Sequence, residues 1–343
     1  MFAKRSPQVP IYMDAHATTR VDPRVVEAML PYFDVAYGNA ASRHHQFGWT
    51  ARDAVAAARD TIAQLIGASP REIVFTSGAT ESNNLAIKGS VEAARDRGNH
   101  VVTVSTEHRA VLDPCARLEQ QGVRVSYLPV APEGLVSPVA LERAIEPDTV
   151  LVTVMWANNE IGVVQPISEL TRVTLAHGVP FHTDAAQAVG FVPIDVQTTQ
   201  VDLLSLTAHK VYGPKGVGAL FIRNGSAVAP MIDGGGHERG LRSGTLNVPG
   251  IVGFGRAVEL CRDDMAGQTT ELRRLRDRLW RHLDEAVDGL SVNGSVTARL
   301  PHNLNITVEG VSGEPLLAGL SEVAVSSGAA CSSSRREPSH VLL

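Results

Sequence analysis

Hydrophobic and polar positions follow two different periods along the first 250 residues. Short apolar runs such as residues 150–154 (VLVTV) alternate with segments whose apolar residues recur at helical spacing. Strands that are apolar throughout are typical of a parallel sheet covered by helices on both faces. We therefore predict an α/β fold with a mostly parallel, seven-stranded sheet. The expected strands are residues 72–75, 101–105, 123–128, 150–154, 180–182, 203–206 and 218–222, and the main helices are residues 49–65, 81–97, 110–121, 138–145 and 167–177.

The pattern changes after Pro249. Apolar residues at helical spacing are followed by a charged stretch at residues 271–288, and beyond it we expect strands at 303–308 and 323–326. A helix at residues 314–320 separates these two strands. The sequence thus predicts a large domain of residues 14–260 and a smaller α+β domain made of residues 1–13 and 261–343.

Composition narrows the class of protein. The 343 residues carry 31 basic and 36 acidic side chains, a net charge of −5, and this argues against a nucleic-acid-binding protein. No apolar run approaches the roughly 20 residues that cross a membrane, and the N-terminus has no apolar signal segment. The three cysteines are too few and too far apart for a disulfide framework or a zinc site. We expect a protein of the reducing cytoplasm with no bound metal.

Three turns after predicted strands carry the candidate chemistry. Residues 76–82 (TSGATES) lead into a helix whose free N–H groups favour an anion, although a plain helix cap explains this string equally well. Asp184 ends one apolar strand, and Lys210 follows the next. Each taken alone fits a helix cap or a surface position, but together they match the needs of pyridoxal phosphate. The lysine would form a Schiff base, the carboxylate would keep the pyridine nitrogen protonated, and His108 could lie against the ring.

The strings around these residues resemble a known family. The sequence is similar, from Tyr12 to Leu343, to the cysteine desulfurases of the IscS/NifS class, which are fold-type I pyridoxal-phosphate enzymes of the class-V aminotransferase family. Each string is short, but their number and order make the resemblance specific. They are residues 17–19 (ATT), 38–39, 76–84, 106–108 (TEH), 158–162 (NNEIG), 182–187 (HTDAAQ), 209–216 (HKVYGPKG), 234–247 and 326–332.

The resemblance implies a role for each matching residue. Lys210 would carry the cofactor covalently, and Asp184 would bind its pyridine nitrogen. Gln187 would contact the ring hydroxyl, while His108 would stack on the ring and move protons. The other expected cofactor contacts are Ala79, Thr80, Thr207 and His209 at the phosphate, Asn159 at the hydroxyl side, and Thr245 at the phosphate of the partner subunit in a homodimer.

Cys331 carries the sulfur chemistry in this interpretation. It lies in a stretch of Ser, Gly and Ala residues, which is typical of a loop, whereas Cys115 and Cys261 share apolar helical faces and are expected in the core. The resemblance implies that the Cys331 thiolate takes sulfur from L-cysteine, leaving L-alanine and a persulfide. The sulfur would pass to an acceptor for iron–sulfur cluster assembly, such as a scaffold protein, or for tRNA thiolation.

The sequence also departs from the family pattern. Residues 14–16 (DAH) stand where the family often has small polar residues, and no residue matches the arginine that binds the substrate carboxylate. Residues 337–340 (EPSH) look like a helix start, and because a single turn is not stable alone we expect the sequence to be incomplete at its C-terminus or a fragment with impaired activity. Three alternatives remain: another fold-type I enzyme such as a selenocysteine lyase or an aminotransferase, a non-catalytic sulfur-relay subunit, and a simple thiol redox protein.

Overall fold

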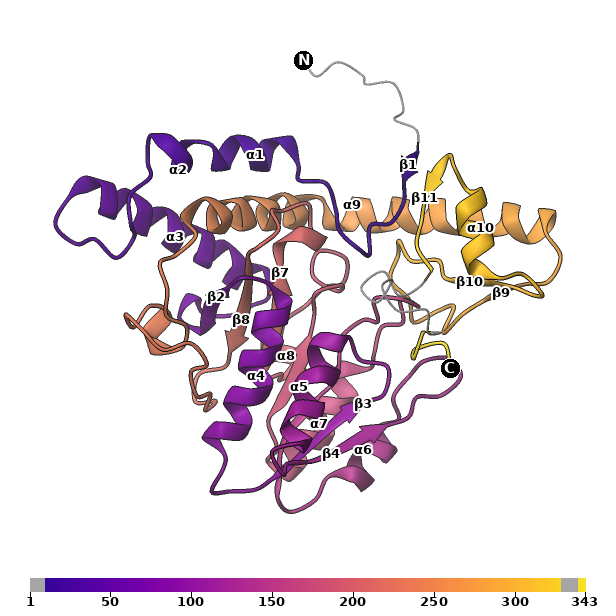
Figure 1. Cartoon of the computed structure of the whole chain (residues 1–343), viewed down its shortest axis with the longest axis horizontal. Helices are drawn as coiled ribbons and strands as arrows, with labels where there is room; N and C mark the ends of the chain where they lie inside the picture. The colour runs from indigo at the N-terminus through magenta and orange to yellow at the C-terminus, as the bar shows by residue number, and fades with distance from the viewer. Residues whose placement is uncertain (1–9, 328–338) are drawn as a thin grey trace.

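A seven-stranded sheet forms the centre of the computed structural model, which describes residues 10–327 and 339–343 (Figure 1). The strand order is β2-β8-β7-β6-β5-β3-β4. Only β8 runs antiparallel to its neighbours, so β2 points the same way as the five parallel strands. The prediction of a mostly parallel α/β sheet is confirmed. The strands are β2 (Ile73–Thr76), β3 (His100–Val104), β4 (Arg124–Leu128), β5 (Thr149–Thr153), β6 (Phe181–Asp184), β7 (Leu203–Thr207) and β8 (Gly218–Ile222).

Helices cover both faces of this sheet. On one face, α4 and α5 enclose an apolar cluster that includes Leu85, Val111 and Leu203. On the other, α3, α7 and α9 enclose a cluster that includes Ile62 and Phe254. The two clusters explain why the strands are apolar on both sides. The helices are α1 (Pro23–Met29), α2 (Pro31–Asp34), α3 (Gln46–Leu65), α4 (Ala79–Ala93), α5 (Arg109–Glu119), α6 (Pro138–Ala144), α7 (Ile167–His177), α8 (Val196–Thr199) and α9 (Val248–Ala286).

The helices α3 and α9 pack closely because small residues face each other. The buried side chains of α3 recur every three or four residues, and a Cβ on Gly255 of α9 would lie 2.8 Å from the Cα of Ala58. A larger residue at position 255 would therefore push the two helices apart. This contact anchors the first part of α9 to the sheet.

The remaining elements form a second, smaller region. The strand β1 (Ile11–Tyr12) pairs in parallel with β11 (Val323–Ala324), and β9 (Leu290–Val292) pairs antiparallel with β10 (Ile306–Val308). Figure 1 shows β1 and β11 beside α10 (Gly313–Gly319), away from the large sheet. Three short 3₁₀ helices complete the described elements: Pro70–Glu72, Ala208–Lys210 and Glu238–Gly240.

The apolar and charged segments that the sequence separates after Pro249 are one continuous helix, α9, of 39 residues. Exposed ion pairs such as Arg274–Glu271, three residues apart, favour helix in its charged half. The buried residues of α9 end at Cys261. The division into domains near residue 260 thus falls within a helix, at the point where its burial ends, and it stays a prediction.

Candidate active site

The candidate residues come together where the parallel strands end. The turns after β2, β3, β5, β6 and β7 all emerge at one edge of the sheet, because these five strands run in the same direction. In α/β sheets this carboxyl edge is where ligands bind. The turns bring together Ala79 and Thr80, His108, Asn159, Asp184 and Gln187, and Thr207, His209 and Lys210.

The start of α4 is shaped to receive an anion. Its N-cap is Gly78, which has φ +148° and contributes no side chain to cap the first N–H groups. A Cβ on Gly218 of β8 would lie 2.7 Å from the Cα of Gly78, so both positions need glycine for this approach. Thr207 is buried near the same turn, while Thr80 is exposed on the first turn of the helix. Backbone N–H groups and hydroxyls are thus available for a phosphate group.

Asp184 is held in one orientation by two hydrogen bonds. The Nδ2 of Asn83 donates to its Oδ2 at 2.6 Å, and the backbone N–H of Ala186 donates to its Oδ1 at 2.9 Å. The carboxylate is buried at the end of β6. Asn83 was given no role by the sequence, although its polar side chain interrupts the apolar face of α4 and could have marked it.

Lys210 lies in the short helix that follows β7 and is buried. Its Nζ donates to the carbonyl oxygen of Ala17 at 2.9 Å and to that of His16. The segment that supplies these carbonyls is itself attached to the turn, because Thr19 donates through its backbone N–H and its hydroxyl to the carbonyl of His209, both at 2.9 Å. The amine therefore points into the site rather than into solvent.

The turn after β3 contains a carboxyl group that the sequence left without a role. Glu107 is completely buried, and its Oε1 accepts a hydrogen bond of 2.6 Å from the backbone N–H of Met155. Burial raises the pKa of Glu107 well above its usual range, and the charge of Asp184 raises it further. Glu107 is thus driven toward its protonated form by its surroundings. It fixes the turn that carries His108, whose Nδ1 accepts from the N–H of Ala110 at 3.0 Å at the start of α5.

Two further candidate residues, His209 and Asn159, lie at the edge of the candidate site. Burial lowers the pKa of His209 to about 4, helped by the positive charges of Lys210 and Lys215, so its imidazole is neutral at pH 7. Its Nδ1 lies 3.1 Å from the hydroxyl of Thr18. Asn159 is partly exposed on the turn after β5.

Thr245 lies apart from these residues, exposed on the loop before α9. Two ion pairs attach this loop to the start of α4 and to α3, and a hydrogen bond attaches it to β2. Arg242 donates to Glu81 in the first turn of α4 at 2.7 Å, and Glu238 pairs with Arg59 at 2.6 Å while accepting the N–H of Phe75. The loop is thus fixed close to the anion site of its own chain.

The cysteines divide as the sequence predicts, as far as the structure describes them. Cys115 and Cys261 are buried in the two apolar clusters. Burial raises the pKa of the Cys115 thiol to about 12 and that of Cys261 to about 11, so neither forms a thiolate at neutral pH. Cys331 lies outside the described residues.

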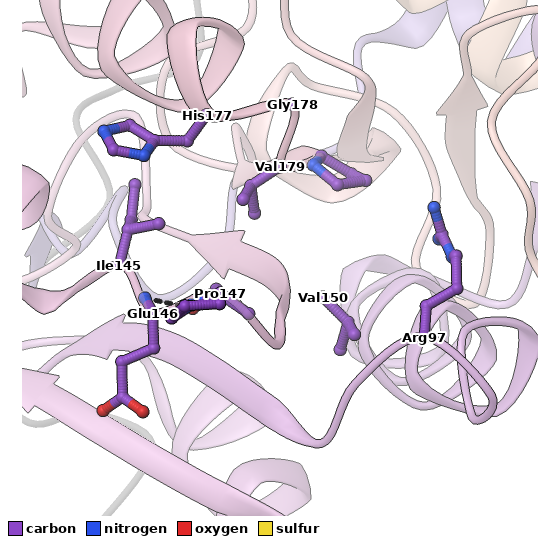
Figure 2. Close-up of a pocket in the computed structure, with 10 residues that line it drawn as sticks. Arg97, Ile145, Glu146, Pro147, Val150, His177, Gly178 and Val179 are labelled. Carbon is purple, nitrogen blue, oxygen red and sulfur yellow. Dashed lines mark hydrogen bonds between the residues drawn. The ribbon is translucent and has the colours of Figure 1, made fainter.

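A pocket of about 430 Å³ lies elsewhere. Figure 2 shows it lined by Glu146 and Val150, where β5 begins, and by His177 and Val179, before β6. These are the amino ends of the strands, opposite the edge that gathers Asp184 and Lys210.

In residues 10–327 and 339–343 no cluster of three or more His, Cys, Asp or Glu could hold a metal ion. None of the described helices is both long and apolar enough to span a bilayer.

Comparison with known proteins identifies the family. The model of the family described as "Aminotransferase class-V" matches residues 11–343. The chain belongs to this family. Within it, the chain is 56% identical to cysteine desulfurase IscS of Anaeromyxobacter sp. (strain Fw109-5) over 98% of its own length and 83% of that relative. Identity to cysteine desulfurase IscS of Rickettsia rickettsii (strain Iowa) is 49% over 97% of the chain and 82% of the relative.

A solved structure supports the same family assignment. The structure described as a NifS-like protein superposes with a TM-score of 0.89 and 39% identity, covering 96% of this chain and 88% of that one. The class-V chain is thus a cysteine desulfurase of the IscS/NifS class, and enzymes of this class depend on pyridoxal phosphate. The residues at the carboxyl edge suit that cofactor, because they combine an amine, a buried carboxylate and an uncapped helix start.

Proposed function

We propose that this cysteine desulfurase holds pyridoxal phosphate at the carboxyl edge of its sheet and takes sulfur from L-cysteine with Cys331. The observation that carries the proposal is the convergence of Lys210 and Asp184 from neighbouring strands, next to the glycine-rich start of α4. Lys210 would bind the cofactor covalently, and Asp184 would face its pyridine nitrogen. Ala79, Thr80, Thr207 and His209 would hold the phosphate, with Gln187 and Asn159 at the ring hydroxyl side.

The cofactor, when bound, supplies an electron sink for the pair released at the α-carbon of an amino acid. The chain's own residues do the rest. Lys210, when its amine is free, would take the α-proton and later return a proton to the product. Asn83 and Ala186 donate to the two carboxylate oxygens of Asp184 and so fix its orientation. His108 sits on the adjacent turn and would stack on the ring and move protons.

Cys331 completes the reaction. Its thiolate attacks the sulfur of L-cysteine, the carbon–sulfur bond breaks, and a sulfur–sulfur bond forms on the enzyme. The carbon that loses sulfur gains a proton, so L-cysteine and one thiol give L-alanine and one persulfide. The outer sulfur then passes to an acceptor thiol, such as that of an iron–sulfur scaffold protein or of a tRNA-thiolation pathway. A reducing cytoplasm suits this step because it keeps the Cys331 thiol free.

The attachment of the cofactor can be tested by borohydride. Reduction of the loaded enzyme should fix pyridoxal phosphate to Lys210, found by mapping the labelled peptide. Lys215, exposed five residues further on, is the matched control: Lys215→Ala should keep the label and Lys210→Ala should lose it. Labelling at Lys215, or none in the parent enzyme, contradicts the assignment.

We propose also that the enzyme is a homodimer in which Thr245 reaches the phosphate of the partner's cofactor. Thr245 is exposed, and the loop that carries it is attached to the anion site of its own chain by the Arg242–Glu81 pair. Large apolar side chains are exposed on the first three helices and the segment between them, which suits a surface covered by a second copy. They include Phe33, Val35, Tyr37, Phe47 and Trp49.

Mixed dimers test this arrangement. A dimer of one Lys210→Ala chain and one Thr245→Ala chain has one site with both defects and one intact site. Random subunit exchange between equal amounts of the two variants makes half of the dimers mixed, and each mixed dimer has one intact site of two, so mixing should restore about a quarter of the cofactor bound by the parent. If both residues serve a site within one chain, mixing restores nothing.

A further inference from the structure

A line of hydrogen bonds runs from the second region of the molecule to Gln187. Gln187 is attached to His16 at both ends of its amide: Nε2 donates to the carbonyl oxygen of His16 at 3.0 Å, and Oε1 lies 3.0 Å from its Nδ1. The other ring nitrogen of His16, Nε2, lies 3.2 Å from Nδ2 of Asn303. His16 therefore stands between two amide side chains.

The donor and the acceptor of each hydrogen bond can be assigned by starting from Arg299 and from the carbonyl oxygen of Glu160. Arg299 can only donate, and its Nη1 donates to Oδ1 of Asn303 at 2.7 Å. Nδ2 of Asn303 donates to the carbonyl oxygen of Glu160 at 3.0 Å, so this amide has one orientation. Nε2 of His16 must then accept from Asn303, and Nδ1 must carry the proton that it donates to Gln187.

Only the neutral imidazole satisfies these contacts. A second proton on Nε2 would face the amide N–H group of Asn303, and the positive charges of Lys210 and Arg299 lie close by. Burial lowers the pKa of His16 to about 4, which agrees with this tautomer. The ring is also stacked on His302, with centroids 4.6 Å apart, so it cannot turn freely.

We propose that His16 is a positioning residue that fixes the amide of Gln187 with its N–H group toward the cofactor ring. The inference rests on the proposed contact between Gln187 and the ring hydroxyl. If the amide turned over, its carbonyl oxygen would meet the carbonyl oxygen of His16, so the donor direction is set before the cofactor binds. A small polar residue at position 16 could not reach Gln187 and Asn303 together.

The test uses the cofactor-loaded enzyme and measures the absorbance maximum of bound pyridoxal phosphate and its dissociation constant. His16→Phe keeps a ring on His302 but loses the N–H donor, and it should shift the absorbance band and weaken cofactor binding about tenfold. His16→Asn places an N–H donor near the position of Nδ1 and should keep the parent spectrum. His302→Phe is the matched control, a buried ring in the same stack that does not contact Gln187, and it should leave the band unchanged.

A second comparison separates this inference from the proposed function. In the double variant His16→Phe/Gln187→Ala, the effect should be no larger than that of Gln187→Ala alone, because both changes remove the same contact. A band shift in Gln187→Ala with a parent spectrum in His16→Phe overturns the role of His16 only. A parent spectrum in Gln187→Ala overturns both the role of His16 and the assignment of Gln187. If His16→Phe does not fold, His16→Gln, whose donor sits near Nε2, replaces it with the same expected shift.

Discussion

The carboxyl edge of the sheet is built differently from the second half of α9 and the strands β9 and β10. At the sheet edge, Asp184, Thr207 and Lys210 are buried, and hydrogen bonds from α4 and from the segment that contains Ala17 hold Asp184 and Lys210. Beyond Cys261, α9 has no buried residue, and the strands β9 and β10 are partly exposed. A cofactor needs a fixed site, whereas a thiol that collects sulfur and gives it away must reach two places. The difference in packing therefore suits a division of labour between the two regions.

The largest expected effect separates sulfur transfer by Cys331 from cofactor binding at the sheet edge. Cys331→Ala should lower sulfur transfer from L-cysteine by about 10³-fold or more, because the nearby serines are poor nucleophiles, and it should leave cofactor binding intact. Asp184→Ala should instead weaken cofactor binding itself. Absorbance of the bound cofactor and persulfide formation, measured on both variants, check this. Loss of cofactor in Cys331→Ala would show that the regions are not separable.

A smaller effect concerns stability along α9. Ile251→Ala, in the buried half, should lower the free energy of unfolding by about 3 kcal/mol, since it leaves a cavity. Leu279→Ala, in the exposed half, removes a side chain that is 38% exposed and should cost less than about 1 kcal/mol. Urea unfolding of both variants measures the difference. Equal losses would mean that the second half of α9 is packed as firmly as the first.

Thiol reactivity should also differ between Cys331 and the two buried cysteines, Cys115 and Cys261. A pKa of about 12 for Cys115 and about 11 for Cys261, against an ordinary 9.0, lowers their thiolate fractions by about 10³- and 10²-fold. In the native enzyme at pH 7, a thiol reagent should therefore label Cys331 about 10³-fold faster than Cys115 and about 10²-fold faster than Cys261. In denaturant all three cysteines should react at similar rates. Fast labelling of Cys115 in the native state would contradict its burial.

A further difference is a pH dependence of the stability of the sheet. Burial lowers the pKa of His182 on β6 from 6.5 to about 3, so between these values the unfolded chain binds a proton that the folded chain does not. Stability then falls as pH decreases through this window, by up to about 1.4 kcal/mol per pH unit for this group. His182→Asn should flatten the fall between pH 6 and pH 4, measured by urea unfolding. His177→Asn removes an exposed imidazole and should leave the slope unchanged.

The sequence predicted the sheet well because strands buried on both faces leave a strong apolar pattern. Asp184 and Lys210 could be found for the same reason, since each is a charged residue at the end of such a strand or in the turn that follows it. The network of His16, Gln187 and Asn303 could not be found, because its members are up to 287 residues apart and meet only after folding. The continuity of α9 was missed because a change from apolar to charged composition looks like a boundary, although a helix can pass from core to solvent unbroken.

Because α9 is long and is buried only in its first half, a small bend near Cys261 would displace its far end. From Cys261 to Ala286 it extends about 38 Å without buried support, at 1.5 Å per residue. A bend of only about 5° at Cys261 would displace its far end by about 3 Å, comparable to a hydrogen-bond length. Beside the bridge between Val163 and Arg299, the backbone N–H of Val164 donates to Ala298 and that of Leu300 donates to Gly162, so the segment after β9 is held to the turn after β5. A small deflection of α9 would therefore move its far end relative to a segment that these hydrogen bonds hold beside the sheet edge.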